Sequence, residues 1–153
     1  MKPAQAIKTC LTKSFQFRGR ASRSEYWWFF MATLLLSFLF MRVDIDVFQK
    51  DFWEPSVSFW PASDTFAFLS LLPLTTVGAR RLQDISLPSW PAILVSLLFV
   101  LWITTEWGAP TEAPISNIAY VVMVLSFFLL VAAIFPSNPG PNKYGPNPHE
   151  VPS

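Results

Sequence analysis

The chain has 153 residues, which is enough for one domain. Charged residues make up 14% of it, whereas a soluble domain carries about 25%. Polar side chains are therefore too few to cover a water-soluble surface, and a net charge of +1 argues against a nucleic-acid-binding chain. One cysteine excludes an intrachain disulfide, and one cysteine and one histidine far apart argue against a metal or haem site, so no cofactor is expected.

Residues 1–22 form a basic segment that precedes the first apolar stretch. Ser22 and Glu25 have the spacing of a capping box, so a helix is predicted to begin near Arg23. The first transmembrane span is then predicted at about 23–41. A cleaved signal peptide is a poorer interpretation, because no small-residue cleavage site follows the apolar run.

Three further apolar stretches predict three more spans, at about 60–79, 88–105 and 115–135. The first of these is the weakest, because it contains Pro73 and Gly78. Backbone groups in lipid must form hydrogen bonds within the chain, so each span is expected to be helical. The sequence therefore predicts an all-α fold, an integral membrane bundle of four transmembrane helices.

The last segment, residues 136–153, is rich in Pro, Gly and Asn. Proline lacks a backbone N–H and fixes φ, so this tail is expected to form turns and extended chain at the membrane surface. The transmembrane domain accordingly covers 23–135.

Lys and Arg are distributed unevenly between the connections. Nine of the eleven precede the first span, join the second to the third, or follow the fourth. The positive-inside rule therefore predicts that both termini lie in the cytoplasm. The first outer connection collects acidic residues, which we interpret as solvated loop groups: Asp44, Asp46, Asp51 and Glu54.

Arginines are expected to gather at the cytoplasmic headgroup level, near the start of the first span and the end of the second. The free N–H groups and the dipole of a helix N-terminus favour anions, and phospholipid headgroups are abundant there. We therefore expect an anion or anionic-lipid site formed by Arg18, Arg20, Arg23, Arg80 and Arg81. The simpler alternative is that these arginines only fix the orientation of the helices.

Two carboxylates accompany these arginines. Asp84 follows Arg80 and Arg81 at helical spacing, and Glu25 lies in the first turn of the first span, so both are expected to form structural ion pairs. The aromatic residues at the same level are expected to anchor the helices at the interface: Tyr26, Trp27, Trp28 and Trp90.

No catalytic pattern is visible in the sequence. We therefore expect a non-enzymatic membrane protein that engages anionic lipid or a partner protein, and no nucleic acid. A small transporter or channel component is the alternative, as a homo-oligomer because four short helices enclose little space. Transporters usually carry a charged residue in mid-span, and here none is seen. An enzyme that acts on lipid-linked substrates through Asp84 or Glu25 is a third interpretation.

Three motifs follow one another along the chain: Phe17-Arg-Gly-Arg-Ala-Ser-Arg-Ser-Glu-Tyr-Trp-Trp-Phe29, Ala79-Arg-Arg-Leu-Gln-Asp84 before Trp90, and Pro141-Asn-Lys-Tyr-Gly-Pro-Asn-Pro148. Together they resemble the bacterial inner-membrane family called domain of unknown function 805. The resemblance implies a small multi-pass protein of the bacterial inner (plasma) membrane and supplies no activity.

The chain departs from the pattern of that family at two places. Gln83 stands where the family commonly has a histidine, so no role that depends on a histidine is carried over. Leu87-Pro-Ser-Trp90 replaces a turn that is more like Ser-Gly-Trp. All three motifs fall on the side predicted to be cytoplasmic, which directs attention to the inner headgroup plane.

Overall fold

A computed structural model describes residues 1–48, 60–106, 117–148 and 150. This part of the chain is helical and contains no strand, so the expected all-α fold is confirmed for it. Its helices are α1 (Pro3–Thr12), α2 (Arg23–Val47), α3 (Pro61–Asp84), α4 (Trp90–Glu106) and α5 (Asn117–Ile134).

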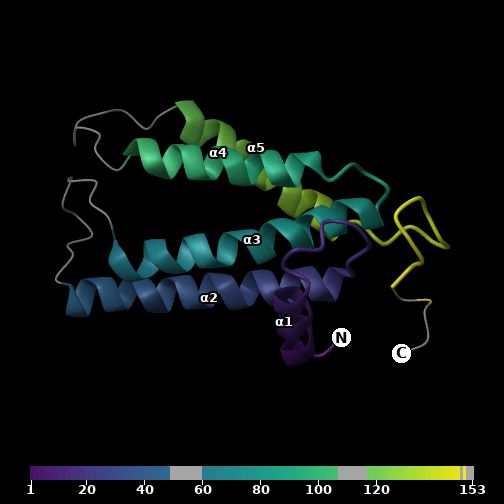
Figure 1. Cartoon of the computed structure of the whole chain (residues 1–153), viewed down its shortest axis with the longest axis horizontal. Helices are drawn as coiled ribbons and strands as arrows, with labels where there is room; N and C mark the ends of the chain where they lie inside the picture. Colours follow the sequence, from purple (N-terminus) through teal and green to yellow (C-terminus); the bar gives the residue numbers. More distant parts are fainter. Residues whose placement is uncertain (49–59, 107–116, 149, 151–153) are drawn as a thin grey trace.

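The four long helices are arranged as two antiparallel pairs (Figure 1). Helices α2 and α3 lie side by side, and α4 packs against α5. Helix α1 crosses the end of the bundle where α2 begins and α3 ends. The tail that follows α5 lies at this same end, so the first and last described segments are neighbours.

Helix α2 begins where its cap was predicted. The Ser22 side chain accepts a hydrogen bond of 3.1 Å from the backbone N–H of Glu25, which confirms Ser22 as the N-cap. The helix continues to Val47, six residues beyond the predicted end of the span. An exposed ion pair between Arg42 and Asp46, one helical turn apart, accompanies this extra length.

The interpretation of Asp44 as a solvated loop acid is wrong. Asp44 lies within α2 and is fully buried. Its carboxylate accepts hydrogen bonds of 2.8 Å from the backbone N–H groups of Ala62 and Ser63, in the first turn of α3. The free N–H groups of a helix start need such an acceptor, so Asp44 ties the end of α2 to the start of α3. Asp51 and Glu54 lie outside the described residues.

Helix α1 was not predicted as an element of its own. Pro3 occupies the first turn, where a missing N–H costs nothing, and Ala6 and Cys10 are buried one turn apart. Lys2, Lys8 and Lys13 are exposed. The helix therefore has one apolar side docked on the bundle and a basic side turned outward.

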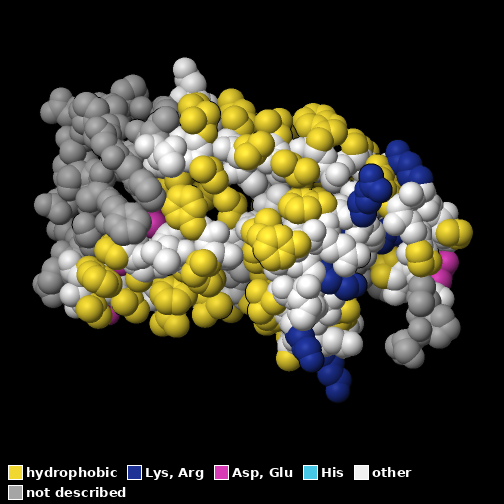
Figure 2. Space-filling model, viewed as in Figure 1, with side chains coloured by type: hydrophobic (Ala, Val, Ile, Leu, Met, Phe, Trp, Pro, Cys, Tyr) yellow, Lys and Arg dark blue, Asp and Glu magenta, His cyan; other side chains and the backbone are white. Residues whose placement is uncertain are grey.

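Apolar side chains cover much of the outer surface of the long helices (Figure 2). By length and composition α2 and α5 could each cross a membrane, whereas α4 is apolar but shorter. Only 17% and 11% of the apolar windows of α2 and α5 are buried, so these are not core helices of a soluble protein. Exposed apolar surface of this extent marks a membrane or protein interaction surface.

Candidate functional site

Five charged side chains are buried together at the end of the bundle where α1, α2 and α3 meet. None is more than 8% exposed. They are Arg20, Glu25, Arg80, Arg81 and Asp84, which we call the buried charge cluster. Charged groups are almost never this deeply buried unless they are paired, and three cations face two anions here.

Asp84 is the centre of one half of the buried charge cluster. Its Oδ1 accepts a hydrogen bond of 2.7 Å from Nε of Arg20. Its Oδ2 accepts from Nη1 of Arg81 and from the hydroxyl of Ser137. The structure thus joins the loop before α2, the end of α3 and the start of the tail through one carboxylate.

Glu25 and Arg80 form the other half. Oε1 of Glu25 lies 2.7 Å from Nη1 of Arg80, so this carboxylate pairs across to α3. Nε and Nη2 of Arg80 have no hydrogen-bond partner among the described residues, although the side chain is 1% exposed. The Cys10 thiol lies 3.8 Å from the same carboxylate. Burial, together with the charge of Glu25, raises the pKa of this thiol to about 12, so Cys10 is inert at neutral pH.

Backbone contacts hold the loop before α2 against α3. The N–H of Ala21 donates to the carbonyl of Arg80 at 3.2 Å. The side chain of Gln83 accepts from the N–H of Gly19 at 3.0 Å and donates to the carbonyl of Phe17 at 2.9 Å. Gly19 has φ of 119°, a conformation that glycine adopts at little cost. The Gln83 amide therefore has a structural role: through one donated and one accepted hydrogen bond it holds the loop before α2 against α3.

The tail folds over the buried charge cluster. Arg20 donates to the carbonyls of Asn138 and Gly140 at 2.5 and 2.7 Å. The N–H of Asn138 donates to the carbonyl of Asp84 at 3.2 Å, and the side chain of Asn142 donates to the carbonyl of Gln83 at 2.9 Å. The three motifs singled out in the sequence therefore meet in one hydrogen-bonded network.

The predicted site residues divide into two groups. Arg20, Arg80 and Arg81 are held inside by carboxylates and carbonyls, whereas Arg18 and Arg23 are exposed. Glu25 and Asp84, expected in ion pairs, are the carboxylates of the cluster. The expected interface anchors also differ: Trp28 and Trp90 are 44% and 60% exposed, Trp27 is half-buried, and Tyr26 is buried at 6%.

Sequence reasoning missed the polar residues of the tail that complete this site. Ser137, Asn138, Gly140 and Asn142 were assigned only to a Pro-rich surface segment. A usable signal was present, because residues 136–148 alternate Pro and Gly with Asn, and Asn side chains commonly bond to nearby backbone. What the sequence could not supply was the partner, since the contacts span more than 50 residues.

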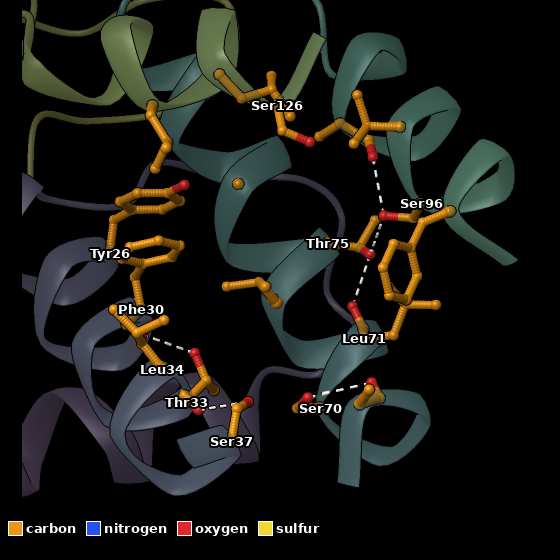
Figure 3. Close-up of a pocket in the computed structure, with 18 residues that line it drawn as sticks. Tyr26, Phe30, Thr33, Leu34, Ser37, Ser70, Leu71, Thr75, Ser96 and Ser126 are labelled. Carbon is orange, nitrogen blue, oxygen red and sulfur yellow. Dashed lines mark hydrogen bonds between the residues drawn. The ribbon is translucent and has the colours of Figure 1, made fainter. Parts of the chain in front are cut away.

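A cavity of about 320 Å³ lies between α2, α3, α4 and α5. None of its 18 lining residues is charged, and seven carry a hydroxyl group. Five of these hydroxyls donate to carbonyls of their own helices; they belong to Thr33, Ser37, Ser70, Thr75 and Ser96. The Thr75 and Ser96 hydroxyls also lie 2.5 Å apart, between α3 and α4, so one of the two can donate to the other in place of its own carbonyl (Figure 3). The walls therefore present mainly carbon to the interior.

Known proteins similar to this chain are membrane proteins. Inner membrane protein YhaH of Escherichia coli strain K12 is 25% identical over 132 residues, which is 86% of each chain, and its counterpart in strain O157:H7 matches equally. No solved structure matches. These relatives support a bacterial inner-membrane location.

The family comparison covers most of the same residues. The family model that matches is described as Protein of unknown function (DUF805), and it covers residues 14–146. The match begins just after α1 and ends in the tail that closes the buried charge cluster. All the residues of that cluster fall within the match. The resemblance noted from the three motifs is confirmed, and the chain belongs to the DUF805 family.

Proposed function

We propose that this chain is a multi-pass inner-membrane protein with four spans, α2 to α5, and both termini in the cytoplasm. Exposed apolar residues on all four helices support the spans, such as Leu35 on α2, Leu69 on α3, Leu97 on α4 and Phe127 on α5. The basic residues gather at the end of the molecule that carries α1 and the tail, which supports the orientation (Figure 2).

We further propose that the protein is non-enzymatic and binds the headgroup of an anionic phospholipid at this cytoplasmic end. The observation that carries the proposal is the division of the arginines. The two carboxylates of the buried charge cluster are already paired with its three guanidinium groups. They are therefore not partners of the exposed Arg18 and Arg23. These two side chains, with the lysines of α1, form a basic rim free to meet phosphate.

The same geometry argues against acid–base catalysis. Glu25 is held by Arg80, and Asp84 accepts from Arg20, Arg81 and Ser137. Both carboxylates are taken up by partners inside the bundle, whereas a general acid or base must reach the substrate.

The experiment substitutes the exposed rim and leaves the buried charge cluster intact. The double variant Arg18→Gln/Arg23→Gln should retain about 30-fold less phosphatidylglycerol in native mass spectrometry, because each basic residue near the surface contributes about 1 kcal/mol. Arg42→Gln is the control, since this exposed arginine lies at the opposite end of α2. Equal lipid retention by all three proteins would refute the proposal.

A small oligomeric transporter or channel component is the second candidate. The hydroxyl-bearing cavity favours it, because such a protein needs a path lined by Ser and Thr. An uncharged lining with most hydroxyls bonded to carbonyls makes this path a poor route for ions. Ion flux into vesicles that contain the purified protein would favour this candidate over the first.

A further inference from the structure

The cavity between the four long helices begins close to the basic rim. On α2 its lining includes Tyr26, Phe30, Thr33 and Ser37, which recur at helical spacing along one face. Arg23, three residues before Tyr26, lies on that same face and is exposed at the cytoplasmic end. One side of α2 therefore leads from an exposed guanidinium group directly to the cavity.

The shape and chemistry of the cavity suit a hydrocarbon chain. From Tyr26 to Ser37 it follows about 16 Å of α2, at about 1.5 Å per residue. Eleven of the 18 lining residues have no polar side-chain group, among them Leu34, Leu74 and Val95. An empty apolar cavity forgoes the dispersion contacts that its walls would make with an occupant. Figure 2 shows hollows among the apolar side chains between the two helix pairs.

Two hydroxyl groups differ from the other five. Those of Tyr26 and Ser126 have no hydrogen bond to any described residue, and both point into the cavity (Figure 3). Tyr26 lies three residues after Arg23, about 5 Å farther along the axis of α2 at about 1.5 Å per residue. A lipid whose phosphate meets Arg23 therefore brings its ester oxygens to the level of a free hydroxyl donor.

We propose that this cavity holds one acyl chain of the anionic phospholipid whose headgroup binds the basic rim. The inference rests on the proposed function and adds the site of the chain. The polar order along α2 matches that of the lipid. Arg23 offers a cation for the phosphate and Tyr26 a hydroxyl for the ester, and from Phe30 onward the hydroxyls of the wall are bonded to carbonyls of α2.

The test uses phosphatidylglycerol that carries a diazirine halfway along one acyl chain, mixed into phosphatidylethanolamine vesicles that contain the full chain. After irradiation, mass spectrometry should find adducts on cavity residues such as Leu71, Leu74 and Val95. Adducts only on outward residues such as Leu35 and Leu97, at 64% and 63% exposure, would overturn the proposal.

A pair of variants on α4 provides the matched control. Val95→Phe fills the cavity and should lower cavity adducts at least five-fold, whereas Leu97→Phe, on the outer surface, should leave them unchanged. Equal labelling of both variants would contradict the inference. If Val95→Phe does not fold, the adduct map of the unaltered chain decides the question by itself.

A change of the lipid headgroup in the probe distinguishes the headgroup proposal from the cavity proposal. With a phosphatidylcholine probe of the same chain, cavity labelling should fall relative to phosphatidylglycerol. Equal cavity labelling by both lipids would refute the headgroup proposal and uphold the cavity. A preference for phosphatidylglycerol with adducts confined to outward residues would uphold the headgroup proposal and refute the cavity.

Discussion

Asp84 shows how a single carboxylate can organise several segments. It accepts from Arg20, Arg81 and Ser137, which belong to different parts of the chain, and it is fully buried. Removing charges from water costs several kcal/mol per ion, so such a cluster is weak evidence for net stability. Its better-supported consequence is specificity, because a shifted helix register would leave a buried guanidinium group without its acceptor.

Cys10 provides a residue-scale test of how α1 docks. A pKa of about 12 in place of 9.0 lowers the thiolate fraction about a thousand-fold at neutral pH, and the thiolate is the reactive form. Iodoacetamide at pH 8 should therefore leave Cys10 unmodified in the folded protein and modify it rapidly in denaturant, as measured by mass spectrometry.

The control for this prediction is a thiol on the exposed side of the same helix. Thr12→Cys in a Cys10→Ala background should react at the rate of a free thiol in both conditions, because Thr12 is exposed. Fast modification of Cys10 in the folded protein would show that α1 is not docked as described.

At the scale of elements, the contacts of the tail are the feature that sequence patterns predict least well. The described residues of the tail, up to 148 and 150, have no regular secondary structure beyond an isolated bridge between Asn142 and Gly145, yet they supply acceptors to a buried arginine. Hydrogen bonds to charged groups contribute about 1.5–3 kcal/mol each. The tail is thus part of the folded domain and not an appendage.

Truncation tests this role of the tail. A chain that ends at Phe135 loses the two tail carbonyls that accept from Arg20, together with the Ser137 hydroxyl, so its thermal unfolding midpoint in detergent should fall by several degrees. A chain that ends at Pro148 keeps these contacts and should unfold close to the full-length midpoint. Equal midpoints for both truncations would contradict the assignment.

The elements divide clearly into those that local patterns predict and those that they do not. The start of α2 follows from Ser22 and Glu25, because a helix cap is a local interaction. The extension of α3 from the expected end at 79 to Asp84 does not, because it depends on contacts of Arg80 with the loop before α2. The burial of Asp44 was missed for the same reason, since the N–H groups that donate to its carboxylate lie on another helix, α3.

For the whole molecule, charge distribution makes the orientation testable. A reporter active only in the cytoplasm should function when fused after Pro148 and fail when fused after Phe48 at the other end of α2. A reporter active only outside the cytoplasm should give the reverse result. The opposite pattern for the two sites would overturn the proposed orientation, with both termini in the cytoplasm.

At this scale the sequence predicted the all-α class and the family, because composition and three motifs carry that information. The sequence also predicted that the arginines and carboxylates of the buried charge cluster lie at one end of the bundle. It could not tell which arginines are buried, since Arg18 and Arg20 are two residues apart and differ only in what the folded chain places around them. The cavity likewise arises from how the helix pairs diverge.

The cap that Asp44 provides on α3 has a mechanical consequence. It fastens α2 to α3 at one end, while the Glu25–Arg80 pair and the Ala21–Arg80 hydrogen bond fasten them at the other. A change in the spacing of α2 and α3 would therefore have to break one of these two sets of contacts. Separation of α3 from α4 would instead have to break the contact between the Thr75 and Ser96 hydroxyls.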